Sequence, residues 1–230
     1  MTPEEYIEIG KRRLELHSLV VSLGIANTHF YLAKKLDEAE KGEFQTELHK
    51  SLDFWDYTIR AHAQIAMVYL CRVFDAHGED KRGRPHHLLK FVSEIFEKEK
   101  TNAKLSPDQK EQLGKDINFL QKENRKLKTQ PDQKVTRLRT MRDNFYSHLN
   151  YDLAIGDFES FQKRQSVDVK VDLQEIQGLV DSGFSILERW AFYYGFKGEF
   201  PRLVERKDDY RFVLESLRLR LLQQKSMAAS

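Results

Sequence analysis

The amino-acid sequence predicts an all-α fold, an antiparallel helical bundle with additional peripheral helices. Apolar residues recur at a three-four spacing through several long segments, which is the pattern of helices with one buried face. Signals that favour helix starts stand before these segments, as where Ser106 precedes Pro107. Only residues 167–171 alternate apolar and charged side chains as a short extended segment does. Helices therefore supply nearly all of the predicted structure.

The composition describes a protein with a sizeable core and heavily charged outer faces. Of its 230 residues, 40% are apolar and 32% are charged, yet the formal net charge is only +2. The net field of the whole molecule therefore does not attract polyanions, and any contact with nucleic acid must come from a local patch. No internal repeat or linker divides the sequence, so we expect a single domain over residues 1–230, with its core at about 40–195.

The sequence also bears on the compartment. A single cysteine excludes an internal disulfide. No apolar run approaches the roughly 20 residues of a membrane span, and the acidic beginning of the chain lacks the features of a signal peptide. We therefore expect a cytoplasmic protein with no membrane partner.

The first two predicted helices span residues 3–40 and about 43–75. Pro3 suits the first turn of the earlier helix, and Lys41-Gly42 ends it. The later helix has the longest three-four stripe in the chain, and we expect it to lie in the core. The stripe consists of Phe44, Leu48, Leu52, Trp55, Ile59, His62, Ala66, Tyr69 and Val73.

Four histidines have either a structural role or a role in catalysis or metal binding. His62 lies on the core stripe, where a hydrogen-bonded structural histidine is more common than a catalytic one. His77, His86 and His87 lie near the start of the next predicted helix, at about 86–100, and raise the question of a metal. Adjacent histidines on a helix point about 100° apart, and no cysteine or HExxH pattern accompanies them. We expect no metal and no cofactor.

The later helices are predicted at about 106–124, 132–150, 172–195 and 208–223. The first has a thin apolar stripe and is expected at the periphery, whereas the helix at 172–195 is expected in the core. The basic run at 122–128 is either a phosphate-contacting patch or a solvated loop. The basic amphipathic helix at 208–223 is either a docking helix or an RNA-binding arm.

The helix at 132–150 carries a charge on its apolar face. Its stripe consists of Val135, Leu138, Arg142, Phe145 and Leu149. A guanidinium stays charged in proteins and is rarely buried without a partner. Arg142 is therefore either a structural ion pair, with Asp56 or Asp75 of the core helix as partner, or part of the chemistry of the protein.

His148 follows Arg142 by six residues, which turns it about 120° around the helix, so one copy of the helix does not make a tight pair. Two copies placed across a twofold axis would bring two arginines and two histidines into one cleft. This set suits RNA cleavage without a metal. Histidine can move the proton of the 2′-hydroxyl or of the leaving oxygen, and arginine can stabilise the phosphate in the transition state.

The sequence from Arg142 to His148 resembles the Arg-x(4–6)-His motif of the HEPN superfamily, with Asp143 as the polar residue that usually follows the arginine. The surroundings resemble the bacterial abortive-infection, Abi U-like, branch of that superfamily. The similarity includes the aromatic segment 54–57, the segment 72–75 at the end of the same predicted helix, and the segment 146–149. It covers roughly residues 40–195.

This resemblance implies a HEPN-like homodimer that cleaves RNA in phage defence or as a toxin, with an antitoxin or another defence protein as a partner. It implies that Arg142 and His148 are catalytic and that Asp143 positions one of them. Some HEPN toxins carry a tyrosine two residues after the histidine, which a nucleotidyltransferase modifies. Here that position is Asn150, and a tyrosine follows one residue later. The alternatives are a non-catalytic HEPN-like module that binds RNA, a nucleotide or a protein, and a purely scaffolding bundle.

Overall fold

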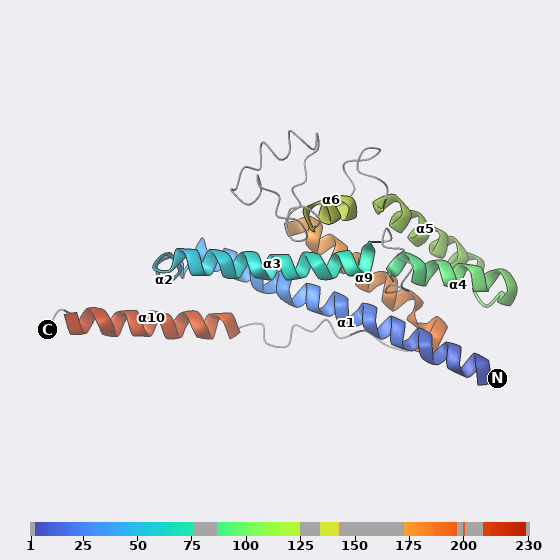
Figure 1. The fold of residues 1–230 in the computed structure, drawn as a ribbon, viewed down its shortest axis with the longest axis horizontal. Helices are drawn as coiled ribbons and strands as arrows, with labels where there is room; N and C mark the ends of the chain where they lie inside the picture. Colours follow the sequence, from blue (N-terminus) through green and yellow to red (C-terminus); the bar gives the residue numbers. More distant parts are fainter. Residues whose placement is uncertain are drawn as a thin grey trace. The chain divides into compact units, whose positions relative to one another are not determined.

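The computed structural model describes residues 3–75, 87–124, 134–142, 173–196, 200 and 209–228, and most of these residues are helical (Figure 1). The elements are α1 (Pro3–Glu40), α2 (Gln45–His49), α3 (Leu52–Phe74), α4 (Leu88–Asn102), α5 (Pro107–Glu123), α6 (Lys134–Met141), α9 (Leu173–Trp190), the 3₁₀ helix η2 (Ala191–Tyr194) and α10 (Asp209–Ala228). These ranges contain no strand, and the all-α prediction is confirmed. The extended segment expected at 167–171 lies outside them. Across the same ranges, no helix combines the length and the apolar character needed to cross a membrane.

The prediction of one continuous helix at about 43–75 is wrong. α2 ends at His49, a turn occupies residues 50–51, and α3 begins at Leu52 with the Trp55 N–H donating to the Ser51 carbonyl at 3.1 Å. Phe44 and Leu48 are buried before the turn, whereas Leu52 is 47% exposed after it. Apolar spacing continues through the turn, but spacing alone does not reveal that the backbone changes direction there.

The predicted start of α5 is confirmed in detail. The Ser106 hydroxyl accepts a hydrogen bond from the Gln109 N–H, and the Gln109 side chain accepts one from the Ser106 N–H. This reciprocal capping box satisfies backbone donors that a helix start would otherwise leave unpaired. Pro107 fits the first turn because that position needs no backbone donor.

The internal contacts divide the chain into two compact units. The first consists of Met1–Leu23 and Met67–Pro201, and the second of Gly24–Ala66 and Arg202–Ser230. Two of the three divisions fall inside helices, one within α1 and one within α3, and the third follows Pro201. The single domain expected over residues 1–230 stays a prediction.

The first unit is built on α4, α5 and α9, with α4 and α5 packed along each other (Figure 1). Its buried side chains include Phe74, Phe91, Leu113, Leu120, Val180, Phe184 and Trp190. A buried polar group joins α5 to α9, because the Asp116 carboxylate accepts hydrogen bonds from Arg189 at 2.6 Å and from the Trp190 indole at 2.7 Å. The expected peripheral helix is therefore tied into the core by a carboxylate that its thin apolar stripe does not reveal.

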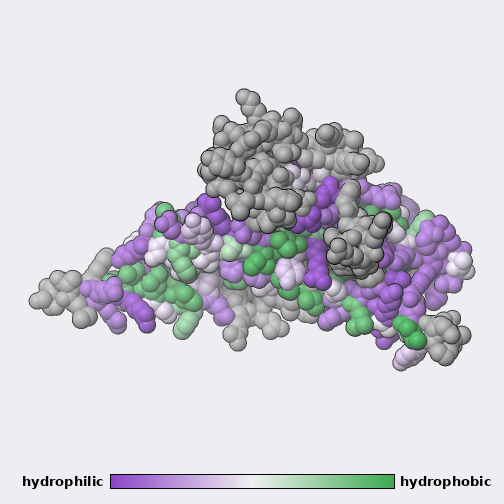
Figure 2. Space-filling model, viewed as in Figure 1, coloured by the Kyte–Doolittle hydropathy of each residue, from purple (hydrophilic) through white to green (hydrophobic). Residues whose placement is uncertain are grey.

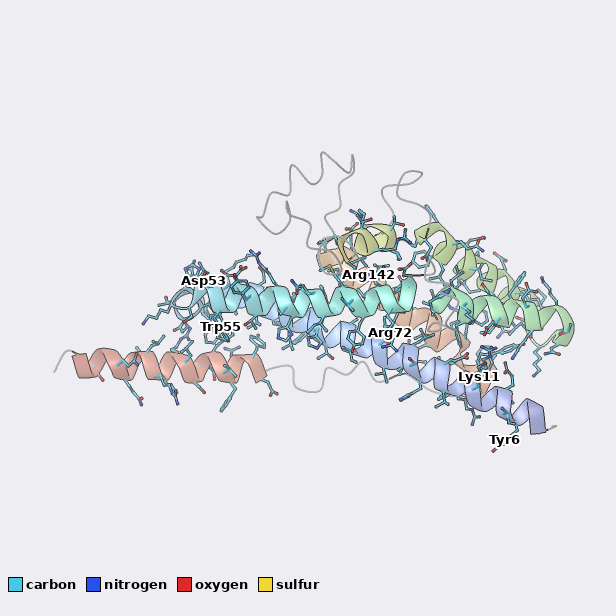
Figure 3. All side chains as sticks on the ribbon, in the orientation of Figure 1. Tyr6, Lys11, Asp53, Trp55, Arg72 and Arg142 are labelled. Atoms are coloured by element: carbon cyan, nitrogen blue, oxygen red, sulfur yellow. The ribbon has the colours of Figure 1, made fainter. Side chains whose placement is uncertain are left out.

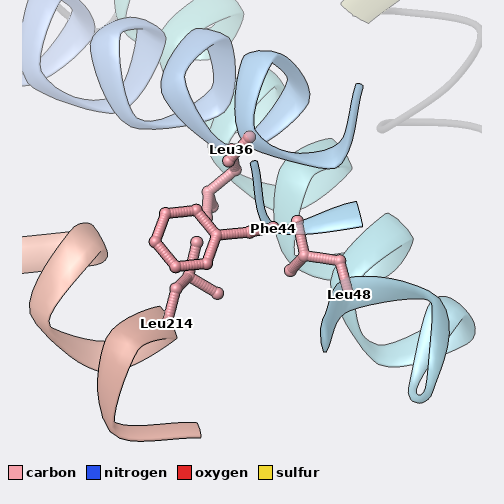
Figure 4. Close-up of a cluster of buried hydrophobic side chains, with 5 residues drawn as sticks. Leu36, Phe44, Leu48 and Leu214 are labelled. Atoms are coloured by element: carbon pink, nitrogen blue, oxygen red, sulfur yellow. The ribbon is translucent and has the colours of Figure 1, made fainter. Parts of the chain in front are cut away.

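The core of the second unit brings α10 against the end of α1 and against α2. Figure 4 shows Leu36, Phe44, Leu48 and Leu214 in one buried cluster. The Arg218 guanidinium lies 4.4 Å from the centroid of the Phe44 ring, and its Nε donates to Glu47 Oε1 at 2.8 Å. Of the two readings of the basic tail, these contacts agree with the docking helix.

α10 also carries apolar residues on its outer side. Phe212, Val213, Leu219 and Leu222 are exposed, and a green, hydrophobic area lies over this helix in Figure 2. The inward residue Leu214 is fully buried. α10 is therefore apolar on two sides and packs with only one of them in the described part of this unit.

Candidate functional site at the end of helix α6

Helix α6, in the first unit, is anchored by its apolar face and by the end of α5. Val135 and Leu138 are fully buried, as their positions on the stripe predict. The Glu123 side chain accepts a hydrogen bond from the Val135 N–H at 3.3 Å, and the Thr136 hydroxyl donates to the Glu123 backbone carbonyl at 3.2 Å. The buried face and the hydrogen-bonded first turn fix the direction in which the next turn extends.

Arg142 lies directly after α6, and its guanidinium contacts the end of α3 (Figure 3). Nη1 of Arg142 donates to Oδ2 of Asp75 at 3.1 Å. Nη1 of Arg139, one helical turn earlier, donates to Oδ1 of the same carboxylate at 3.3 Å. The side chain of Asp75 is 9% exposed, that of Arg139 15% and that of Arg142 28%. Two guanidinium groups thus share one nearly buried carboxylate, and Arg142 is the more exposed of the two.

Asp75 is held in place through the backbone at the end of α3. Its N–H donates to the Cys71 carbonyl at 2.8 Å, which continues the helical pattern by one residue. The buried Asn124 side chain donates to the Phe74 carbonyl at 3.0 Å and to the Leu120 carbonyl at 2.8 Å. Carbonyls at a helix end need such donors, because no later turn supplies them. Asn124 therefore joins the ends of α3 and α5 directly beside the carboxylate.

Two guanidinium groups converge on one carboxylate in this group. A carboxylate with both oxygens engaged orients its donors, and a guanidinium offers several N–H groups in one plane. Such a group is suited to binding an anion, above all a phosphate, whose oxygens match the planar fork of arginine.

The sequence-predicted site residues are only partly within the described ranges. Arg142 is described, and the structural reading with Asp75 as partner is confirmed as a contact. Asp56, the other proposed partner, instead pairs with Arg60 on its own helix at 2.9 Å. Asp143 and His148 lie outside the described residues, as does the rest of the motif.

Arg139 is the one contributor to this group that sequence reasoning missed. A signal for it exists, because Arg139 and Arg142 are three residues apart and so lie on one side of the helix. The signal is weak, since two arginines at this spacing are usually solvated. The spacing of the two arginines becomes informative only when it is known that both contact Asp75, which lies far away in the sequence.

The histidines do not form a metal site in the part of the chain described. No group of three or more histidine, cysteine, aspartate or glutamate side chains could hold a metal ion there. The ring of His87 caps α4 by accepting from the Lys90 N–H at 3.2 Å, whereas His77 and His86 fall outside those ranges. His62, in the second unit, is hydrogen-bonded as the structural reading expects, with its Nδ1 at 2.7 Å from Nδ1 of His29.

The fold and this site define an all-α protein with an arginine held at the end of a core helix. Comparison with protein families then identifies the family: the model of HEPN_AbiU2, described as AbiU2, matches residues 8–199. This match covers well over half of the chain, so the protein belongs to the HEPN_AbiU2 family, and the resemblance stated from the motif is confirmed. Comparisons with curated proteins and with solved structures give no match. Helix α10 follows the matched residues.

Proposed function

We propose that this protein is a metal-independent endoribonuclease of the HEPN type, acting in phage defence by abortive infection or as a toxin. The observation that carries the proposal is the placement of Arg142. In a chain of the HEPN_AbiU2 family, this arginine begins the Arg-x(4–6)-His pattern read from the sequence and is held, partly exposed, by a carboxylate at the end of a core helix. A positive group in this setting is suited to a backbone phosphate.

The proposed chemistry uses the 2′-hydroxyl of the RNA as the nucleophile. His148 takes the proton of this hydroxyl, the 2′-oxygen bonds to phosphorus, and the bond to the 5′-oxygen breaks. The leaving oxygen takes a proton from water, and His148 returns the proton it accepted to the solvent. Arg142 stabilises the charge on the phosphate oxygens, and Asp143 positions the arginine or the histidine. The products are a 2′,3′-cyclic phosphate and a free 5′-hydroxyl.

The proposed active form is a homodimer. In the helix predicted over residues 132–150, six residues turn His148 about 120° away from Arg142, so one copy would not pair them tightly. Two copies across a twofold axis supply two arginines and two histidines to one cleft. An antitoxin or another defence protein is the proposed restraining partner, since a general ribonuclease would harm its own cell.

The test compares wild-type protein with His148→Ala and Arg142→Ala, in cells and in purified form. Expression of the wild type should arrest growth and fragment total RNA, and neither variant should do so. Cleavage by the purified protein should persist in a metal chelator and should leave cyclic phosphate ends. An oligonucleotide with a single 2′-deoxy sugar at the cut position is the matched control and should stay intact. A folded His148→Ala protein that still cuts RNA would contradict the proposal.

A non-catalytic HEPN-like module that binds RNA, a nucleotide or a protein is the second candidate. The Asp75 carboxylate favours it, because this partner satisfies the charge of Arg142 without any substrate. Under this function, purified wild-type protein binds RNA but leaves it uncut at every concentration, and the two variants change binding alone.

A further inference from the structure

The carboxylate shared by two arginines has a consequence for Arg142 that the family motif does not contain. Asp75 comes from α3, far from the motif in sequence, and engages Nη1 of Arg142 at 3.1 Å. Its other oxygen is engaged by Arg139 at 3.3 Å, and Asn124 fixes the adjacent Phe74 carbonyl. Each of these contacts restricts the carboxylate, and the carboxylate in turn restricts the guanidinium of Arg142.

We propose that Asp75 is a positioning residue for Arg142, with Arg139 holding the second carboxylate oxygen so that the first stays directed at Arg142. This inference rests on the proposed ribonuclease function. Asp75 itself touches no substrate under this proposal, because its side chain is 9% exposed and both of its oxygens are engaged. Arg142, at 28% exposure, is the member of the group that a phosphate can reach.

The physical reason is the cost of ordering a long side chain. An arginine side chain loses conformational entropy at several rotatable bonds when it binds a phosphate. A partner that orders the side chain beforehand removes this cost from the transition state. Pre-ordering therefore raises kcat more than it changes substrate binding.

The opposite role is physically reasonable as well. A carboxylate can mask a guanidinium by competing with phosphate for it, in which case removal of the carboxylate would speed the reaction. The exposure of Arg142 and the second cation on the same carboxylate favour positioning over masking. The two roles predict opposite signs for one substitution.

The test uses Asp75→Asn, which keeps the size of the side chain and removes its charge. The matched control is Glu175→Gln. Glu175 forms a hydrogen-bonded ion pair with Arg137 of α6, and the side chains of this pair are 19% and 15% exposed, so the pair is partly buried like that of Asp75 and Arg142. Both variants weaken an arginine–carboxylate pair that anchors α6, but only the first touches Arg142. Asp75→Glu serves as the conservative variant.

In the cleavage assay, Asp75→Asn should lower kcat by about 10- to 100-fold with little change in KM. Asp75→Glu should recover part of this loss, and Glu175→Gln should stay close to the wild type. Chemical modification of arginines with phenylglyoxal, read by mass spectrometry, gives a measurement that does not need activity. Modification of Arg142 should accelerate in Asp75→Asn and not in Glu175→Gln.

Several outcomes would overturn the inference. One is faster cleavage by Asp75→Asn, which would make Asp75 a mask, and another is an unchanged rate of Arg142 modification. An equal loss in Glu175→Gln would reduce the role of Asp75 to holding α6. If Asp75→Asn does not fold, Asp75→Glu is the deciding variant and must lower kcat in a folded protein. A wild type that never cleaves RNA refutes the ribonuclease instead, and the modification rates still decide whether Asp75 holds Arg142.

Discussion

Nη1 of Arg142 lies 3.1 Å from Oδ2 of Asp75, although 67 residues separate them in the chain. The contact joins the end of α6 to the end of α3 within the first unit. Arg142 is thus both a structural partner and the most exposed of the three side chains of Asp75, Arg139 and Arg142. The two readings of this arginine, as an ion pair and as a catalytic residue, are therefore compatible.

The contribution of the Arg142–Asp75 contact to stability can be measured. Arg142→Ala should lower the free energy of unfolding by about 1–3 kcal/mol, between the values for exposed and for fully buried pairs. Arg139 still contacts the carboxylate in this variant, which limits the loss. The control is Arg60→Ala, whose pair with Asp56 is exposed, and it should cost less than about 1 kcal/mol. Urea unfolding measures both, and equal effects would show that the Asp75 contact adds no stability.

Mixing two inactive proteins tests whether the proposed cleft takes residues from two copies. Arg142→Ala and His148→Ala chains, unfolded together and refolded in equal amounts, should regain about a quarter of wild-type cleavage. Half of the dimers are then mixed, and in each of these one arginine and one histidine can still meet. Each variant refolded alone is the control. No recovery, with mixed dimers demonstrated by differently tagged chains, would mean that the site takes its arginine and histidine from a single copy.

The Asp116 carboxylate should contribute strongly to stability, because it joins α5 to the end of α9. Asp116→Asn leaves Arg189 and the buried Trp190 indole with a neutral partner, and the expected loss is about 3 kcal/mol. Glu111→Gln, on the same helix, removes the exposed ion pair with Lys115 and should have little effect on stability. Thermal or urea unfolding separates the two. A loss no larger than that of the control would refute a structural role for this carboxylate.

Gly183 should resist substitution, because α9 lies close to its neighbours there. A Cβ at this position would lie 2.9 Å from Leu23 Cδ2 and 3.3 Å from Phe74 Cζ, and both side chains are fully buried. Gly183→Ala should therefore destabilise the protein by about 1–3 kcal/mol. Gly114→Ala, where a Cβ meets nothing within 4 Å, should be neutral or stabilising by up to about 1 kcal/mol. The prediction is wrong if both glycines tolerate alanine equally in urea unfolding.

The His29–His62 pair should make the protein less stable in mild acid. Burial lowers the pKa of both rings, and the nearby charge of His29 lowers that of His62 further. The unfolded chain, with pKa values near the ordinary 6.5, then binds protons more readily than the folded one. The free energy of unfolding is therefore greatest above this pH and decreases as the pH falls below it.

Unfolding measured between about pH 7.5 and about pH 5.5 tests this dependence. The control is His62→Gln, which keeps every other titrating group and should have a shallower dependence on pH. Identical slopes for the wild type and this variant would exclude the pair as the cause.

The sequence by itself determined the helical class, most helix boundaries and the buried positions of Val135 and Leu138. These follow from local rules, since apolar spacing and capping residues act within a few turns of the chain. The start of α5 is the clearest case, because Ser106, Pro107 and Gln109 satisfy one another without help from elsewhere.

Only the tertiary structure decided which charges meet. Asp75 rather than Asp56 contacts Arg142, Arg139 takes the other oxygen, and Asp116 reaches the end of α9. The break between α2 and α3 belongs here too, because Phe44 and Leu48 turn toward Leu214 of a helix much later in the chain. Ion pairs and helix directions of this kind depend on how distant segments pack, which no spacing within one segment encodes.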